Sequence, residues 1–334
     1  MPRTSNAPPK FSRGDGNAMN QYRVLNTLDM SRCPEAFEPF SGIATVDTLP
    51  WDYNAVAECI GNYDAYLAST SVRVDAALLA RATRLKVIGS PSTGTDHMDM
   101  AAIRAAGITC YDISKELDLL RGFTATSEHA FALLLALNRK ICQSTAAAAS
   151  GDWARERYTG FQLLNKTLGV LGLGRLGTIS SRIGQGFGMK VIAHDVRAVR
   201  VDGVEMVDFD TLFRQADVVT MHVHLRPETR NLVNARAIGL MKPNAILINT
   251  SRGGLVEEQA LLEALQSGRI AGAGLDIVDG EWNDDIRQHP LIRYARDHDN
   301  LLITPHIGGA THESIYGARI FMARKVAEHL RALS

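Results

Sequence analysis

The chain has 334 residues, and its 36 Lys and Arg side chains balance 36 Asp and Glu side chains. This length favours two domains, because single domains cluster near ~100–200 residues. The even charge and the lack of a long basic block argue against a nucleic-acid partner, and no stretch approaches the ~20 apolar residues that a membrane span needs.

The first twenty residues, MPRTSNAPPKFSRGDGNAMN, contain basic residues and prolines but no apolar core of a secretory signal. We expect a disordered tail over 1–20, or a true start at Met19. The four cysteines are widely separated and form no CxxC pair, which is typical of a reducing environment. Together these features predict a cytoplasmic protein.

Between residues 22 and 112, short apolar runs alternate with helical patterns, as in YRVLNTLDM, DAYLAS, LKVIGS and GITCYD. This alternation predicts a small α/β unit. Residues 128–142, EHAFALLLALNRKIC, are apolar nearly all round. They predict one long helix that is buried between layers and connects two domains.

From residue 167 the alternation becomes regular. Strands are expected at TLGVLG, KVIAHD, DVVTMHV, AILINT, AGAGLDIV and NLLITPHI, with helices between them at 175–187, 209–215, 234–241 and 257–267. Strands that alternate with helices predict a doubly wound parallel sheet covered on both faces. A terminal helix from Thr311 is expected to return the chain to the first domain.

The stretch VLGLGRLG places Gly172, Gly174 and Gly177 between an expected strand and an expected helix. In a dinucleotide-binding turn the first glycine allows the tight bend, the second lets the backbone approach a pyrophosphate, and the third lets helix and strand pack closely. The N–H groups at the helix start would then face the diphosphate.

Asp195 ends the next expected strand. Its carboxylate would accept hydrogen bonds from ribose hydroxyls and repel a 2′-phosphate, so NAD is favoured over NADP. Arg197 would soften that preference if its guanidinium turned toward the ribose. The alternative is an aspartate that only caps the following turn.

Two further side chains follow expected strands, where parallel sheets place their sites. His306 lies in NLLITPHIGG and is a candidate proton donor. Arg252 lies in AILINTSRGG, and its planar guanidinium suits a carboxylate. On the residues alone, a loop histidine and a surface arginine remain open alternatives.

Several motifs, in matching order from about residue 75 to 325, resemble the D-isomer-specific 2-hydroxyacid dehydrogenases and especially their phosphoglycerate dehydrogenase-like branch. The motifs are KVIGSPSTGTDHMDM, SEHAFALLLAL, LGLGRLG, DVVTMHVHLRPETRNLV, LINTSRGGLVEEQALLEAL, AGAGLDI and LLITPHIGG. The resemblance implies a Rossmann-type NAD-binding domain, 119–307, inserted in a smaller flavodoxin-like substrate domain, 21–118 plus 308–334. It also implies a homodimer formed mainly through the nucleotide-binding domains.

The same resemblance assigns three catalytic residues. Arg252 falls on the family's substrate-gripping arginine, His306 on its proton donor, and Glu281 on the glutamate that hydrogen-bonds this histidine. A carboxylate beside an imidazole stabilises the imidazolium, which would protonate the carbonyl oxygen as hydride arrives.

Ligand contacts are implied in the same way. The backbone amides of Ser92, Thr93 and Gly94 would form a small nest for the substrate carboxylate. The implied cofactor contacts are Arg175 and Leu176 at the pyrophosphate, Thr250 and Ser251 beside the nicotinamide, Asp276 at the carboxamide, Gly308 and Gly309 around the ring, and Thr93 from the substrate domain.

The chain departs from the family pattern in two segments, 114–127 and 279–290. In the second, Trp282 replaces the usual proline after Glu281, so Asp279 is a reserve partner for the histidine. His224 replaces another proline and is expected to be a loop residue.

These features predict NAD-dependent interconversion of a small anionic D-2-hydroxy acid and its 2-oxo acid. A phosphorylated or phosphonate-bearing acid is one option, for which Lys115 and Arg121 could supply charge, although solvated surface charge is the simpler interpretation of both. A phosphite- or formate-type anion dehydrogenase and a non-catalytic, NAD(H)-sensing dimeric regulator remain alternatives.

Overall fold

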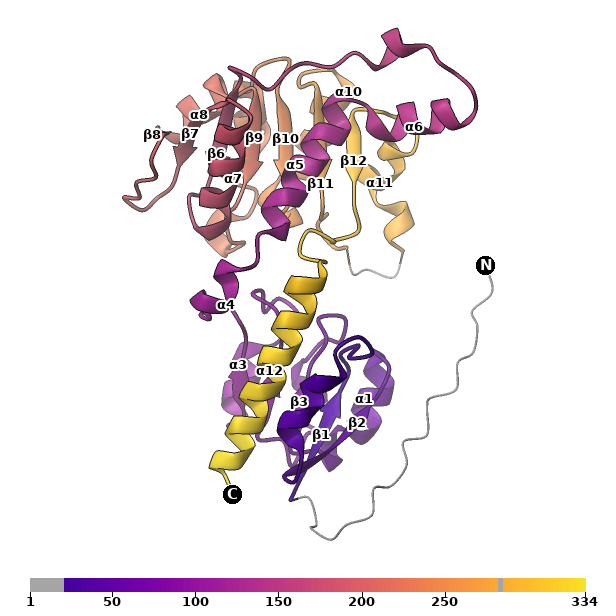
Figure 1. Ribbon diagram of the computed structural model, residues 1–334, viewed down its shortest axis with the longest axis vertical. Helices are drawn as coiled ribbons and strands as arrows, with labels where there is room; N and C mark the ends of the chain where they lie inside the picture. Colours follow the sequence, from indigo (N-terminus) through magenta and orange to yellow (C-terminus); the bar gives the residue numbers. More distant parts are fainter. Residues whose placement is uncertain (1–20, 282–284) are drawn as a thin grey trace. The chain divides into compact units, whose positions relative to one another are not determined.

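The computed structural model describes residues 21–281 and 285–334 of the chain. Its internal contacts divide the chain into two units (Figure 1): unit 1 contains Met1–Leu120 and Tyr316–Ser334, and unit 2 contains Arg121–Ile315. The sequence-based division placed these boundaries at 118/119 and 307/308. The expected tail and Trp282 lie outside the described residues.

Unit 1 is built on a five-stranded parallel sheet in the order β2-β1-β3-β4-β5. This is the flavodoxin-like order, which the family resemblance implies. The strands are β1 (Tyr22–Asn26), β2 (Ala44–Thr48), β3 (Ala65–Leu67), β4 (Val87–Gly89) and β5 (Thr109–Tyr111).

Short helices and one long helix accompany this sheet. Asp52, Asp75 and Asp99 are the N-caps of the first three α-helices, and their carboxylates accept hydrogen bonds from first-turn N–H groups. The helical elements are η1 (Pro34–Phe40), α1 (Tyr53–Cys59), η2 (Ile60–Asn62), α2 (Ala76–Leu79), α3 (Met100–Ala105), α4 (Leu117–Arg121) and α12 (His312–Ala332).

The final helix, α12, is part of the core of unit 1. A Cβ atom at Gly89 would lie 2.6 Å from Val326 Cγ2 and 2.8 Å from Met322 Cγ. Helix and strand therefore meet at a position where only glycine fits. The expected return of the chain to the first unit is confirmed by this contact, and the helix extends to Ala332.

Unit 2 contains a seven-stranded parallel sheet in the order β12-β11-β10-β9-β6-β7-β8. The strand order reverses between β6 and β9, so the carboxyl ends of these two strands flank the crevice in which doubly wound folds bind ligands. The strands are β6 (Thr167–Leu171), β7 (Lys190–His194), β8 (Val204–Met206), β9 (Val218–Met221), β10 (Ile246–Asn249), β11 (Gly272–Leu275) and β12 (Leu301–Ile303).

Helices cover both faces of this sheet. Phe213 of α8 and Leu261 of α10 belong to one buried cluster, and Phe131 and Leu134 of α5 belong to the other. The helical elements are α5 (Ala125–Asn138), α6 (Ile141–Ala149), η3 (Arg155–Tyr158), α7 (Arg175–Gly186), α8 (Phe209–Gln215), η4 (Pro227–Thr229), α9 (Ala235–Leu240), η5 (Gly253–Leu255), α10 (Glu258–Gln266), η6 (Ile286–Gln288) and α11 (Pro290–Ala295).

The single helix expected over 128–142 is wrong in its extent. Helix α5 ends at Asn138, Lys140 adopts a left-handed φ of 49°, and α6 starts at Ile141. Helix α5 packs against α7, β10 and β11 within unit 2, so it covers the sheet of that unit (Figure 1). In the described residues no helix is long and apolar enough to cross a membrane.

Candidate functional site

The glycine turn after β6 is tightly enclosed. Gly172 has a φ of 91°, and a Cβ atom there would lie 2.6 Å from the carbonyl oxygen of His222, which directly follows β9. A Cβ atom at Gly177 would lie 2.0 Å from the carbonyl oxygen of Gly172. Neither position can carry a side chain without moving the backbone, so the start of α7 packs directly on the turn.

The start of α7 offers N–H groups to an anion. Its N-cap residue, Gly174, provides no side-chain cap, and the N–H groups at the start of a helix are general hydrogen-bond donors to anions. Arg175 is the first helical residue and donates to the carbonyl oxygen of Phe123, while the carbonyl oxygen of Leu176 accepts from Ser127 Oγ at 3.0 Å. The turn is therefore also fixed to the start of α5.

Asp195 follows β7 and links the glycine turn to an arginine. Its Oδ2 accepts from the Leu173 N–H at 2.8 Å, and Nε and Nη2 of Arg197 each donate to the carboxylate at 3.0 Å. The hydrogen bonds from Arg197 lower the pKa of Asp195 to about 2. The carboxylate is therefore ionised at neutral pH and is already paired with a cation.

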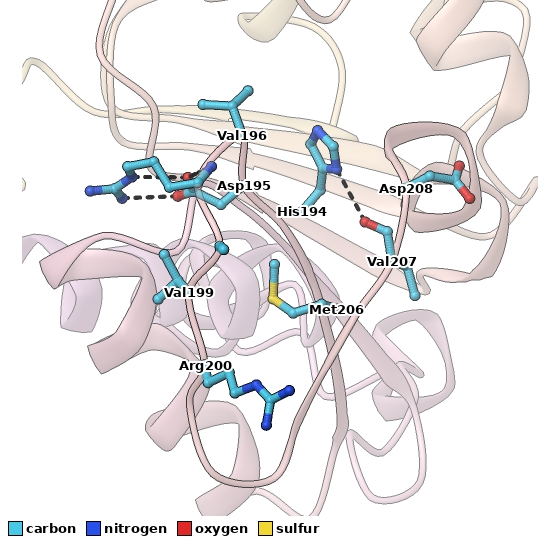
Figure 2. A pocket seen from close by; sticks show the side chains of 10 residues that line it. His194, Asp195, Val196, Val199, Arg200, Met206, Val207 and Asp208 are labelled. Atoms are coloured by element: carbon cyan, nitrogen blue, oxygen red, sulfur yellow. Dashed lines mark hydrogen bonds and ion pairs between the residues drawn. The ribbon is translucent and has the colours of Figure 1, made fainter.

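An open hollow of about 740 Å³ lies beside this pair, bounded by residues 194–200 and 206–208. Figure 2 shows Val199, Arg200 and Met206 around it. The combination of apolar surface, an arginine and an ionised carboxylate suits an aromatic base joined to a sugar.

Asp276, directly after β11, organises the loop that follows β12. Its Oδ1 accepts from Thr304 Oγ1 at 2.6 Å and from the Ile307 N–H at 2.8 Å, and its Oδ2 accepts from the Gly308 N–H at 2.7 Å. The side chain is buried. Burial acts to raise the pKa of Asp276, but the hydrogen bonds from His129, Thr304 and the backbone outweigh it and hold the pKa below its usual value.

The Asp276 network includes two residues that the sequence analysis did not single out. His129 of α5 lies 2.8 Å from Thr304 Oγ1 and 3.3 Å from Asp276 Oδ1, both measured from its Nε2. The only available signal was the SEH motif at the start of α5, because nothing in the sequence pairs residue 129 with 276.

The loop held by Asp276 carries His306. The Nδ1 atom of His306 lies 2.7 Å from Glu281 Oε1, whereas Asp279 pairs with Arg230 at 2.9 Å. Glu281 is thus the carboxylate that orients the imidazole, and it fixes Nδ1–H as the donor in that contact. His306 adopts a left-handed φ of 55°, a conformation that non-glycine residues rarely adopt.

Arg252 lies in the turn after β10. Its carbonyl oxygen accepts from Asn249 Nδ2 at 2.9 Å, and its Nη1 donates to the carbonyl oxygen of Ser251 at 2.7 Å. A Cβ atom at Gly253 would lie 2.1 Å from the backbone nitrogen of Asp279. The turn that carries Arg252 therefore touches the segment that leads to Glu281.

Neighbouring atoms of the same turn bear on a ligand. Thr250 Oγ1 is buried with no hydrogen-bond partner in the described part of the chain, while Ser251 Oγ donates to the carbonyl oxygen of Met221. An orphaned buried hydroxyl is costly unless a ligand or water pairs with it. Because Thr250 and Ser251 follow β10, this hydroxyl lies at the carboxyl edge of the sheet, where a ligand would bind.

The remaining candidates have simpler surroundings. A Cβ atom at Gly308 would lie 2.8 Å from Asp276 Oδ2, whereas a Cβ atom at Gly309 would meet only Thr126 Oγ1 at 3.9 Å. His224 is exposed, and its carbonyl oxygen accepts from Thr229 Oγ1. Lys115 and Arg121 are exposed.

The expected substrate loop belongs to unit 1 and follows β4. Ser92 Oγ donates to the carbonyl oxygen of Gly94 at 2.7 Å and contacts Ser90 Oγ at 2.9 Å, and Ser90 in turn lies 3.1 Å from His97 Nε2. Thr93 is exposed at the tip of this loop. The loop is therefore braced by its own side chains.

Comparisons with known proteins agree with this geometry. Residues 131–308 match the family model described as "D-isomer specific 2-hydroxyacid dehydrogenase, NAD binding domain". The chain is 37% identical over 290 residues to the glyoxylate reductase of Thermococcus litoralis, an alignment that covers 83% of this chain and 82% of the relative.

Two further proteins are similar over most of this chain. The D-3-phosphoglycerate dehydrogenase of Synechocystis sp. is 34% identical over 280 residues, but this chain, 83% of which is aligned, spans only 48% of that relative's length. The D-lactate dehydrogenase of Aquifex aeolicus, solved with NAD and lactic acid, superposes with a TM-score of 0.76 at 25% identity and covers 93% of this chain and 96% of its own.

The Asp276 network can be tested with the substitution Asp276→Asn. An amide group presents a donor where the carboxylate accepts from two backbone N–H groups, so at least one of them loses its partner. We expect the free energy of unfolding to fall by about 1–3 kcal/mol, with faster hydrogen exchange at Ile307 and Gly308. Asp299→Asn is the control, because Asp299 is exposed and accepts only from Gln143 among the interactions described here. Equal stability of both variants would contradict the assigned role.

Proposed function

The chain belongs to the D-isomer specific 2-hydroxyacid dehydrogenase family, and from this premise we propose that it is an NAD-dependent oxidoreductase. The reaction is the interconversion of a small D-2-hydroxy acid and its 2-oxo acid. The observation that carries the proposal is the His306–Glu281 pair at 2.7 Å. It lies on loops at the same sheet edge as the turn that holds Arg252.

The pair supports general acid catalysis by His306. With Nδ1–H held by Glu281, the opposite ring nitrogen, Nε2, is the one that exchanges a proton with substrate. NADH, when bound, would supply the hydride for C2 of the oxo acid in the reduction direction. His306 Nε2–H gives its proton to the carbonyl oxygen, and in the oxidation direction Nε2 takes that proton back.

Arg252 is the proposed substrate anchor. Its planar guanidinium can hold a carboxylate through two parallel N–H donors and polarise the neighbouring carbonyl. The contact between Gly253 and the Asp279 backbone keeps this turn in register with the loop that carries Glu281. In unit 1, the backbone amides of Ser92, Thr93 and Gly94 are proposed to bind a substrate carboxylate.

The residues around the glycine turn fit NAD. Gly172, Gly174 and Gly177 allow a pyrophosphate to approach the start of α7, with Arg175 and Leu176 beside it. Thr250 Oγ1 is buried and has no hydrogen-bond partner among the residues that the structure describes, and a carboxamide or a ribose hydroxyl would satisfy it. Ser251, Gly308 and Gly309 are proposed to line the nicotinamide.

The role of Asp276 is proposed to be indirect. Both of its oxygens accept hydrogen bonds from the loop after β12. Asp276 would therefore act on the nicotinamide site by fixing Gly308 and its neighbours.

A panel of 2-oxo acids of graded size and charge, including phosphorylated ones, tests the activity through the loss of NADH absorbance. We expect turnover of at least one acid, and a decrease of roughly 10²–10⁴-fold in kcat for His306→Ala because the proton donor is lost. His298→Ala is the matched control, since His298 is exposed and bonds to the carbonyl oxygen of Tyr294. NADH binding without turnover of any acid would favour a sensing role, and turnover of phosphite or formate alone would favour an anion dehydrogenase.

The cofactor preference follows from the Asp195–Arg197 pair. The carboxylate repels a 2′-phosphate and Arg197 weakens that repulsion, so Asp195→Ala should reduce the NADH/NADPH ratio of kcat/KM and Arg197→Ala should increase it. Each change is expected to be roughly tenfold, which corresponds to about 1.4 kcal/mol. Steady-state kinetics with both cofactors gives the ratio. Movement of both variants in the same direction would be inconsistent with this explanation.

We also propose that the protein is a cytoplasmic homodimer formed through unit 2. The four cysteines are free thiols, in keeping with a reducing compartment. Large apolar side chains are exposed on residues 141–187 of unit 2, among them Trp153 at 81%, Leu164 at 58% and Phe187 at 40%. Exposed apolar groups of this size are typical of interfaces.

Sedimentation velocity tests the dimer. We expect Trp153→Glu to convert dimers to monomers, because burying a carboxylate in an apolar interface is costly. Trp51→Glu is the control, since Trp51 is 67% exposed but belongs to unit 1. A monomeric parent protein, or a dimer that survives the Trp153 change, would refute the proposed interface.

A further inference from the structure

Glu258 contacts the chain both before and after Glu281. Glu258 is the first residue of α10, and its Oε1 accepts from the Asp279 N–H at 2.8 Å. Its other oxygen, Oε2, pairs with His289 Nε2 at 3.0 Å. Asp279 precedes Glu281 by two residues and His289 follows it, so one carboxylate binds the chain on both sides of Glu281. Glu258, Asp279 and His289 are together called the junction below.

These contacts lie in a partly dry environment. The side chains of Glu258 and His289 are only 18% and 14% exposed. Burial raises the pKa of Glu258, and the nearby Asp279 carboxylate acts in the same direction, whereas the Asp279 N–H and His289 act against them. The charge on Glu258 therefore depends on the two partners that it holds.

The same junction supports the turn after β10. The carbonyl carbon of Val278 would lie 2.2 Å from a Cβ atom at Gly253, the residue after Arg252. Arg230 closes the other side, because it pairs with Asp279 and its guanidinium would lie 3.1 Å from a Cβ atom at Gly254. A shift of Asp279 would therefore displace both the turn that carries Arg252 and the segment that leads to Glu281.

We infer that Glu258 and His289 are positioning residues that set the place of Glu281, and through it the orientation of His306. This inference rests on the proposed function, since it assigns a role in the same reaction. A shift of about 1 Å in a catalytic group can lower a rate by roughly 10²-fold, so the junction needs only a small displacement to affect turnover.

Double-mutant kinetics separates positioning from general stability. We expect Glu258→Ala to lower kcat by about 10- to 100-fold, with an NADH dissociation constant within about twofold of the parent value. Added to Glu281→Gln, the same change should have little further effect, because Glu258 acts through Glu281. Glu258→Gln retains an acceptor for the Asp279 N–H and should recover part of the lost rate. Fully additive losses, or an unchanged kcat in Glu258→Ala, would overturn the inference.

Glu263→Ala provides the control on the same helix, because Glu263 is exposed and its carboxylate accepts only from Gln259 among the interactions described here. His289→Ala serves as a second variant that removes the other half of the junction, so the inference stays testable if Glu258→Ala does not fold.

Hydrogen exchange keeps this inference distinct from the proposed function. Peptides covering 276–281 should exchange faster in Glu258→Ala and His289→Ala than in Glu263→Ala, whether or not a substrate has been found. A parent protein that turns over no 2-oxo acid would refute the proposed function. Unchanged exchange in these peptides would refute the junction itself.

Discussion

The buried carboxylate of Asp276 is the interaction on which the candidate site depends. Its two oxygens accept hydrogen bonds from the backbone N–H groups of Ile307 and Gly308, which lie outside any strand or helix and would otherwise need water as their acceptor. By doing so it holds the following loop in one conformation, in which His306 has a left-handed φ of 55°. Such a backbone costs about 1–3 kcal/mol and persists only where the surroundings over-determine it. His306, the proposed proton donor, is therefore held in place by a buried carboxylate that directly follows the neighbouring strand, β11.

The topology explains why so few residues suffice. Because all strands of unit 2 are parallel, their carboxyl ends meet at one edge, and three successive edge loops carry Arg252, Glu281 and His306. Contacts between these loops need no long side chains. Gly253 lies directly against the Val278–Asp279 backbone, and a single carboxylate from α10 holds the stems around Glu281. Precision in the site comes from backbone packing at glycines and from buried acceptors.

Local pattern predicted those parts of the structure that local chemistry determines. The glycine turn, the strands of unit 2 and helices such as α8 were visible because hydrophobic period and glycine spacing are short-range signals. The break between α5 and α6 was not, since Lys140 adopts a left-handed backbone that its residue type does not favour. The edge strands β2 and β8 were not predicted either, because β2, ATVDT, is mostly polar and β8 has only three residues. Asp276, His129 and Thr304 meet only through tertiary contacts, so no spacing rule connects them, and the Arg197 fork on Asp195 needs a rotamer that sequence does not give.

Unit 1 is assembled from both sides of unit 2 in the sequence, and this has a consequence for synthesis on the ribosome. The sheet of unit 1 is synthesised first. Met322 and Val326, whose side chains pack on Gly89 of this sheet, are synthesised only after the whole of Arg121–Ile315. Until then one apolar face of the sheet is exposed to solvent. Unit 2 is formed by a continuous stretch of chain and can fold during its synthesis. During synthesis, unit 2 can therefore be complete while unit 1 still lacks its last helix, α12.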